Sequence, residues 1–272
     1  MFDVFKNGVF GLIIGSAMLI PGVSGGTTAI ILGIYDRLVT SIGSFFKDVK
    51  HNFLFLASVG AGGIIGVILF SKPLLFLVNL WEAPMLCLFM GATSGSLPML
   101  IRKSKSGFRL STACFALAGF ALVLCISLLP EGFFAFETHC VSGFFILLAA
   151  GIPLAAALVL PGISISYMML VIGIWEPVTV AISSLDILFL APLGIGLALG
   201  VILTTKLLER AMSRYPGQTY FAIIGFVLGS ILEIIRKIPK PDSFYIYPIC
   251  VVMFFLGMAA IWYYSLKIES KS

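Results

Sequence analysis

Charged side chains are scarce in this chain of 272 residues. Only 11% of the residues are Asp, Glu, Lys or Arg, whereas 60% are hydrophobic and the mean hydropathy is +1.14. Roughly a quarter of the residues of soluble globular domains are charged, so this composition excludes an ordinary soluble protein. We expect an integral membrane protein that contacts membrane lipids.

Residues that commonly bind metals are also few. The two histidines, His51 and His139, lie far apart in expected connecting segments, with no carboxylate or cysteine at ligand spacing. The five cysteines form no paired motif and are spread mainly through apolar segments. The sequence therefore predicts no metal site and no cofactor, and it predicts free thiols.

The apolar segments are long enough to cross a bilayer. Segments of roughly 17–25 residues are needed for one helical span, and six such spans are expected at about 53–71, 84–101, 111–129, 187–205, 219–235 and 244–266. The remaining apolar stretches, 8–35 and 141–175, are each interrupted by a Pro-Gly motif. We therefore expect a broken helix in each of them.

The two interruptions are copies of one another. The first reads PGVSGGTT over residues 21–28, and the second reads PGISIS over residues 161–166, 140 positions later. The same offset pairs Gly33 with Gly173 and Asp36 with Glu176. Proline removes a backbone donor and glycine tolerates unusual backbone angles, so backbone polar groups are expected to be free at both breaks. Gly25 is expected to use angles that a β-branched residue reaches only with strain.

The distribution of basic residues decides how the broken helices enter the membrane. If both are re-entrant hairpins, only four of the 17 basic residues, Lys72, Arg236, Lys237 and Lys240, fall outside the cell. Kinked crossings would scatter the basic residues more evenly, so the positive-inside rule favours hairpins with both termini in the cytoplasm. The same bias explains the net charge of +5, so no nucleic-acid partner is expected.

The similarity between the two halves extends beyond the motifs. At an offset of 134, Gly60 matches Gly194, and Gly91 and Gly95 match Gly225 and Gly229. Each unit, 1–130 and 131–272, then contains one hairpin and three spans, and an odd number of crossings inverts the second unit. The predicted fold is an all-α polytopic membrane protein built from an inverted repeat. The sequence leaves monomer and homodimer open.

The breaks favour the binding of an anion. At each break the following half-helix begins with unpaired N–H groups and the positive end of its dipole, and serine and threonine hydroxyls add donors. Neither motif contains Lys or Arg, so an anion would be held mainly by neutral dipoles and could leave again. The residues predicted to bind it are Pro21, Gly22, Val23, Ser24, Gly25, Gly26, Thr27, Thr28, Pro161, Gly162, Ile163, Ser164 and Ser166.

Charged residues near the hairpins have two interpretations. Asp36 and Glu176 follow the half-helices, where an acid is badly placed for the helix dipole. They are either interfacial carboxylates, with Arg37 beside Asp36 as an ion-pair partner, or carboxylates that couple transport to protons. Lys72 and Lys206 either extend to the membrane interface or contact a charged headgroup.

The motifs also resemble a known family. PGVSGGT, the later PGIS, the GIYD segment at 33–36 and the GATSGSLP segment from Gly91 to Pro98 are similar to those of the DUF368 family of bacterial membrane proteins. The resemblance implies translocation of undecaprenyl phosphate, a polyprenyl lipid carrier for cell-wall sugars, from the outer to the inner leaflet of the cytoplasmic membrane. It also implies a fold with opposed re-entrant hairpins. The second motif departs from the first after its serine.

Two other functions remain open at this point. Undecaprenyl pyrophosphate phosphatase also uses inverted repeats and a PGxSRS-type loop, but the arginine of that loop and its glutamate-rich partner motif are missing here. Without a charged clamp or a general base, phosphoryl chemistry is poorly supported, so we do not expect an enzyme. A carrier of a small soluble anion is the other alternative, because composition does not reveal a lipid tail.

Overall fold

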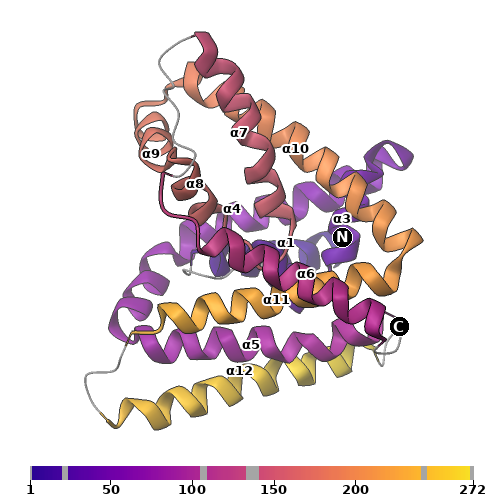
Figure 1. The fold of residues 1–272 in the computed structure, drawn as a ribbon, viewed down its shortest axis with the longest axis vertical. Helices are drawn as coiled ribbons and strands as arrows, with labels where there is room; N and C mark the ends of the chain where they lie inside the picture. The colour runs from indigo at the N-terminus through magenta and orange to yellow at the C-terminus, as the bar shows by residue number, and fades with distance from the viewer. Residues whose placement is uncertain (1, 20–23, 105–108, 133–140, 240–243, 270–272) are drawn as a thin grey trace.

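The computed structural model describes residues 2–19, 24–104, 109–132, 141–239 and 244–269, and these residues form helices joined by short connections (Figure 1). The helices are α1 (Phe2–Ala17), α2 (Gly25–Ile31), α3 (Tyr35–Gly43), the 3-10 turn η1 (Phe45–Lys47), α4 (Val49–Leu80), α5 (Glu82–Lys103), α6 (Leu110–Ser127), α7 (Val141–Val159), α8 (Ile165–Ile172), α9 (Trp175–Ser184), α10 (Ile187–Arg214), α11 (Pro216–Lys237) and α12 (Ile246–Glu269). No strand occurs in these ranges. The all-α prediction is confirmed.

Six of the helices are long and apolar enough to cross a membrane: α4, α5, α6, α10, α11 and α12. They overlap the six spans expected from the sequence. The chain is therefore a multi-pass membrane protein. Within the protein, α5 and α11 are the most enclosed of the six, with 56% and 61% of their apolar windows buried, whereas only 11% of that of α12 is buried. Helices α5 and α11 therefore form the centre of the bundle, and α12 lies on its outside.

The two halves of the chain pack in corresponding ways. In the first half α1 packs along α4, and in the second α7 packs along α10. The last helix of each half packs on the middle span of the other half, α6 on α11 and α12 on α5. Figure 1 shows α5, α6, α11 and α12 side by side in the lower part of the view and α7–α10 above them.

Small residues allow the close packing of the first helix in each half. A Cβ atom added at Gly11 of α1 would overlap the backbone of Val59 in α4, and one added at Gly196 of α10 would overlap the backbone of Leu148 in α7. Glycine at these positions lets the helix backbones approach, which is a common way of packing helices in membranes. These glycines therefore build the scaffold.

Local geometry also repeats between the halves. Asp48 and Asp186 cap α4 and α10, each accepting a hydrogen bond from the backbone N–H three residues later, at 3.3 Å from His51 and 3.2 Å from Phe189. These caps satisfy one of the unpaired donors at each helix start. Both long spans are thus begun by the same type of residue in the same role.

Packing of the short helices differs between the halves. Helix α3 packs against α10, and its Tyr35 hydroxyl, in a buried position, donates a hydrogen bond to the carbonyl oxygen of Val159 at 3.0 Å. Within the described ranges α9 makes no comparable packing against α4. Helices α8 and α9 are instead bent by 107° at their junction. The first broken segment is therefore the more enclosed, whereas most residues of α9 in the second are exposed.

Candidate functional site

A serine begins the helix that follows each break. Ser24 precedes α2 in an extended conformation, with its hydroxyl oxygen accepting from the Thr27 N–H at 3.1 Å, and Ser164 precedes α8 in the same way, accepting from the Tyr167 N–H at 3.4 Å. Serine is among the preferred residues for this capping position. The repeated motif therefore folds into the same local structure at both places.

The two breaks contact each other directly. The backbone N–H of Gly162 donates to both Ser24 Oγ and Thr27 Oγ1 at 3.1 Å, and these two hydroxyl oxygens lie 2.8 Å apart. Ser24 and Thr27 are buried. The Thr28 hydroxyl bonds back to the Ser24 carbonyl oxygen at 3.1 Å. In this conformation the hydroxyls of the first break bind the second break and their own helix, so they join the two halves of the protein.

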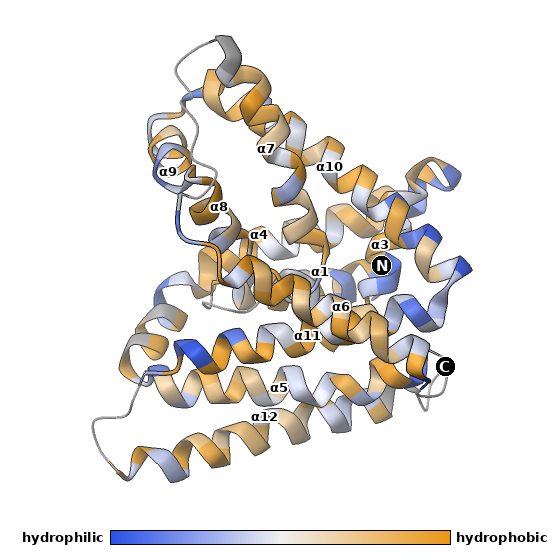
Figure 2. Cartoon of the chain, viewed as in Figure 1, coloured by the Kyte–Doolittle hydropathy of each residue, from blue (hydrophilic) through white to orange (hydrophobic). Residues whose placement is uncertain are grey.

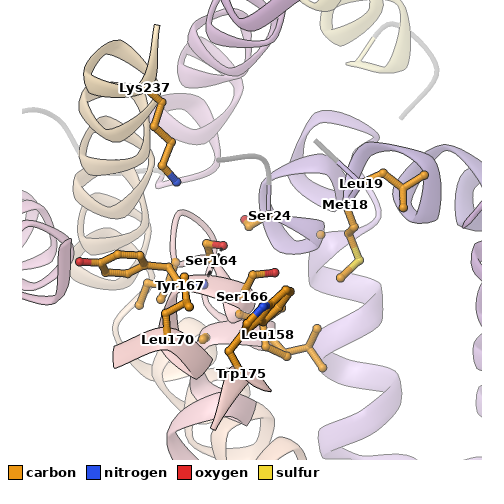
Figure 3. Close-up of a pocket in the computed structure, with 14 residues that line it drawn as sticks. Met18, Leu19, Ser24, Leu158, Ser164, Ser166, Tyr167, Leu170, Trp175 and Lys237 are labelled. Atoms are coloured by element: carbon orange, nitrogen blue, oxygen red, sulfur yellow. Dashed lines mark hydrogen bonds between the residues drawn. The ribbon is translucent and has the colours of Figure 1, made fainter. Parts of the chain in front are cut away.

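A cavity of about 320 Å³ lies beside this contact. The first break contributes Ser24 and Gly25 to its lining, and the second contributes Ile163, Ser164 and Ser166. Figure 3 shows the hydroxyls of Ser24, Ser164 and Ser166 around the cavity, with the Trp175 ring beside them. The volume is at the lower end of the range for small-molecule sites, roughly 300–1,000 Å³. We call it the tip cavity.

Lys237, in the last turn of α11, supplies a cation to the tip cavity. Its ammonium points toward the serine hydroxyls in Figure 3. Its Nζ lies 2.6 Å from Oε1 of Glu233, one turn earlier on α11, and the lysine side chain is 36% exposed against 9% for the glutamate. A buried carboxylate holds the lysine at the wall of the cavity, while the lysine stays partly accessible.

Sequence reasoning did not include Lys237 in the site. One signal could have found it, because Lys237 belongs to the few basic residues that the positive-inside rule leaves on the outer face. In the predicted topology Lys237 is an exception to this rule, and an exception is a candidate for a functional role.

Two kinds of comparison with known proteins identify the family. A profile of the undecaprenyl phosphate translocase-like family matches residues 14–240. The Staphylococcus aureus polyprenyl-phosphate transporter is 32% identical over 262 residues, which cover 91% of each chain. The chain belongs to the undecaprenyl phosphate translocase-like family. The prediction that it resembles this kind of bacterial membrane protein is confirmed.

A second member of this group is more distant. The Vibrio cholerae polyprenyl-phosphate transporter is 28% identical over 238 residues, covering 82% of this chain and 75% of its own. No solved structure matches the chain.

The other residues predicted at the breaks occupy several environments. Pro21, Gly22 and Val23 lie outside the described residues. Gly26, Thr27 and Thr28 are buried behind the tip cavity, and a Cβ atom at Gly26 would approach the Pro161 backbone to 3.2 Å. Pro161 and Gly162 are buried where the breaks meet. Of the predicted binding residues within the described ranges, five line the cavity: Ser24, Gly25, Ile163, Ser164 and Ser166.

The charged residues predicted near the hairpins lie away from the tip cavity. Asp36 forms an ion pair with Lys103 of α5 at 2.6 Å, and the guanidinium of Arg37 lies 4.2 Å from the centre of the Phe55 ring. Glu176, Lys72 and Lys206 are exposed and are not part of its lining. The pairing of Asp36 with Arg37 is therefore replaced by one with Lys103, and a role of these residues in coupling stays a prediction.

The expected misfit of Asp36 and Glu176 with the helix dipole is wrong. Gly33 and Gly173 have φ angles of 74° and 79°, and these turns end the half-helices before the acids are reached. Asp36 and Glu176 then lie in the first turns of the new helices α3 and α9. A carboxylate in the first turn is favourable, so the dipole gives no argument for a functional role.

Proposed function

We propose that this chain transports a polyprenyl phosphate between the leaflets of a bacterial cytoplasmic membrane. Family membership, two similar chains named as polyprenyl-phosphate transporters and six apolar spans support this function. The observation that carries the proposal is the tip cavity, in which both breaks and Lys237 meet.

The tip cavity offers the chemistry that a phosphate monoester requires. Such a headgroup carries a charge of about −1.5 to −2 near neutral pH, and moving an isolated charge into hydrocarbon is very costly. The Lys237 ammonium, the hydroxyls of Ser164 and Ser166 and the first turn of α8 would replace its water shell. With three N–H donors, the Lys237 ammonium would bind the phosphate oxygens while keeping its hydrogen bond to Glu233.

A single cation suits transport. Lysine acts on phosphate as a point charge, whereas arginine forms a rigid two-pronged clamp. The tip cavity has one lysine in its described lining and no arginine. Phosphate bound there would be stabilised enough to enter and would remain free to leave, which is what carriage across a membrane requires.

The same residues support a transporter rather than an enzyme. Hydrolysis of a phosphate ester needs a positioned base or nucleophile and donors for the charge that develops. Of the carboxylates near the tip cavity, Glu233 is engaged by Lys237, and the arginine of the phosphatase loop is absent from both motifs. The names of the two similar proteins also indicate a transporter.

Several observations support re-entrant hairpins in an inverted repeat. Ser24 and Ser164 repeat as caps, and Gly33 and Gly173 repeat as positive-φ turns. Figure 1 places both termini on the same side of the view, and Figure 2 shows hydrophilic residues gathered there. We infer that this side faces the cytoplasm, which puts Lys237, at the opposite end of α11, toward the outer leaflet.

The function is tested with purified protein in liposomes. We expect labelled polyprenyl phosphate to exchange between leaflets in the presence of the protein, without release of inorganic phosphate measured in parallel. Polyprenol without the phosphate should not be exchanged faster than in protein-free liposomes. Release of phosphate would replace the transporter with an enzyme. Movement of a soluble phosphate ester but not of the lipid would favour the small-anion carrier.

A further inference from the structure

A second, larger cavity adjoins the tip cavity. Its volume is about 710 Å³, and it lies among α1, α2, α3 and α4, with contributions from the end of α7 and the middle of α10. Met18, Gly25 and Leu158 line both cavities. These three shared residues place the two spaces next to each other at the first break. We call the larger one the apolar groove.

The lining of the apolar groove suits hydrocarbon. Aliphatic side chains and glycines make up nearly all of it, and its two polar side chains, Tyr35 and Thr205, are already hydrogen-bonded. The Tyr35 hydroxyl donates to the Val159 carbonyl oxygen at 3.0 Å, and the Thr205 hydroxyl donates to that of Val201 at 2.6 Å. Water in such a space would find few hydrogen-bond partners. An apolar chain needs no such partners and would bury its surface favourably there.

The apolar groove reaches from the buried break to the lipid-facing surface. Its inner wall includes Ala29 and Val39, which are 1% and 3% exposed. Its outer rim on α4 includes Ile64 and Ile68, which are 65% and 69% exposed. Since α4 is an apolar span with only 22% of its window buried, the rim faces bilayer lipid. The groove thus extends from the lipid-facing side of α4 to the residues that it shares with the tip cavity.

We propose that the apolar groove holds the phosphate-proximal part of the polyprenyl chain while the headgroup occupies the tip cavity. This inference rests on the proposed function and deepens it, because it assigns a second subsite to the same substrate. It also explains how the chain would select a lipid phosphate over a soluble one. Both present the same phosphate to Lys237, but only the lipid fills the groove.

The repeat supplies a matched pair of variants for a test. Gly60 lines the apolar groove, and a Cβ atom added there would meet no atom within 4 Å. Gly194, its counterpart 134 positions later on α10, is equally open and lines neither cavity. Gly60→Trp should fill the groove without displacing a neighbouring backbone, and Gly194→Trp makes the same change on a surface outside it.

Binding is measured by ligand-induced thermal stabilisation of the detergent-solubilised protein, with polyprenyl phosphate and with butyl phosphate, which carries the headgroup and almost no tail. We expect Gly60→Trp to weaken binding of the polyprenyl phosphate at least tenfold and to leave that of butyl phosphate within twofold of the parent. Gly194→Trp should match the parent with both ligands. Equal affinities of the two variants for polyprenyl phosphate would overturn the proposal. An equal loss of affinity for polyprenyl phosphate and for butyl phosphate in Gly60→Trp would also overturn it.

A second measurement uses the parent protein, so that it does not depend on a variant that folds. Polyprenyl phosphate with a photoreactive diazirine in the isoprene unit next to the phosphate should label peptides from α1 and from residues 56–68 of α4. Labelling confined to α6 or α12, which contribute no residue to the described lining of the groove, would overturn the proposal. Leaflet exchange by the parent is scored separately. If the parent shows no leaflet exchange, the proposed function fails. If it exchanges the lipid but the diazirine labels residues outside the groove, only the proposed role of the groove fails.

Discussion

Lys237→Met should lower the rate of leaflet exchange of polyprenyl phosphate by about 10- to 100-fold. A hydrogen bond to a charged group contributes about 1.5–3 kcal/mol, and each 1.4 kcal/mol corresponds to a factor of ten in affinity. Methionine keeps the length and apolar stem of lysine but removes the cation that lines the tip cavity. Exchange is measured in liposomes at matched protein content. Lys237→Arg should retain part of the activity, because it keeps the charge.

The variant also leaves Glu233 without its partner, and this effect must be separated from the loss of transport. Glu233 is buried, and its carboxylate pairs with Lys237 at 2.6 Å. An unpaired buried carboxylate is destabilising, although partial solvent exposure of the lysine reduces the contribution of the pair to about 1 kcal/mol. Combining Lys237→Met with Glu233→Gln should restore the thermal midpoint in detergent without restoring exchange. Recovery of exchange in the double variant would assign Lys237 a structural role only.

Gly162→Ala should damage both stability and transport. Gly162 has a φ of 87°, in a region of backbone angles that residues with a Cβ atom reach at a cost of about 1–3 kcal/mol. A Cβ atom there would also overlap the carbonyl oxygen of Phe226 in α11. The break would have to move, and the hydrogen bonds from the Gly162 N–H to Ser24 and Thr27 would be lost.

We expect Gly162→Ala to cost about 2–4 kcal/mol of stability, combining backbone strain with the displaced contact. The measurement is thermal unfolding in detergent, followed by leaflet exchange of the folded fraction. Gly194→Ala is the control, since a Cβ atom there meets nothing within 4 Å. Equal thermal midpoints for the two variants would show that the contact between the breaks is not needed for the fold.

Much of the architecture could be predicted because a bilayer restricts what a chain can do. Long apolar segments must be helices in a membrane, so the six spans followed from hydropathy and length alone. The Pro-Gly-x-Ser motifs also carried local information, because a serine after such an interruption is a good helix cap. Both Ser24 and Ser164 have that role.

Other features depend on tertiary contacts that periodicity does not encode. Helices α3 and α9 lie in segments that were expected to be connectors, and the turns at Gly33 and Gly173 reverse the dipole argument for the neighbouring acids. Strain was expected at Gly25, but Gly25 begins α2 and has no positive φ, whereas Gly162 does. The hydroxyls of the first break were expected to face an anion and instead bind the second break.

The sequence predicts only part of the site. The breaks could be found from their repetition, but neither motif contains a cation, and nothing in the local pattern places Lys237, 73 positions after Ser164, beside them. The apolar groove was equally hidden, because its lining comes from six helices and consists of residues that any membrane helix contains. Long-range packing creates both features.

The central claim is that the phosphate headgroup binds in the tip cavity, and protection of a cysteine at Ser166 tests it most directly. Ser166 is exposed and lines the cavity, so Ser166→Cys, in a chain whose five native cysteines are replaced, should react with a small charged thiol reagent. Polyprenyl phosphate should slow this reaction at least fivefold, and polyprenol should not. Ser183→Cys, on the exposed end of α9, should react equally under all conditions. A Ser166→Cys labelling rate unchanged by saturating polyprenyl phosphate would contradict the account.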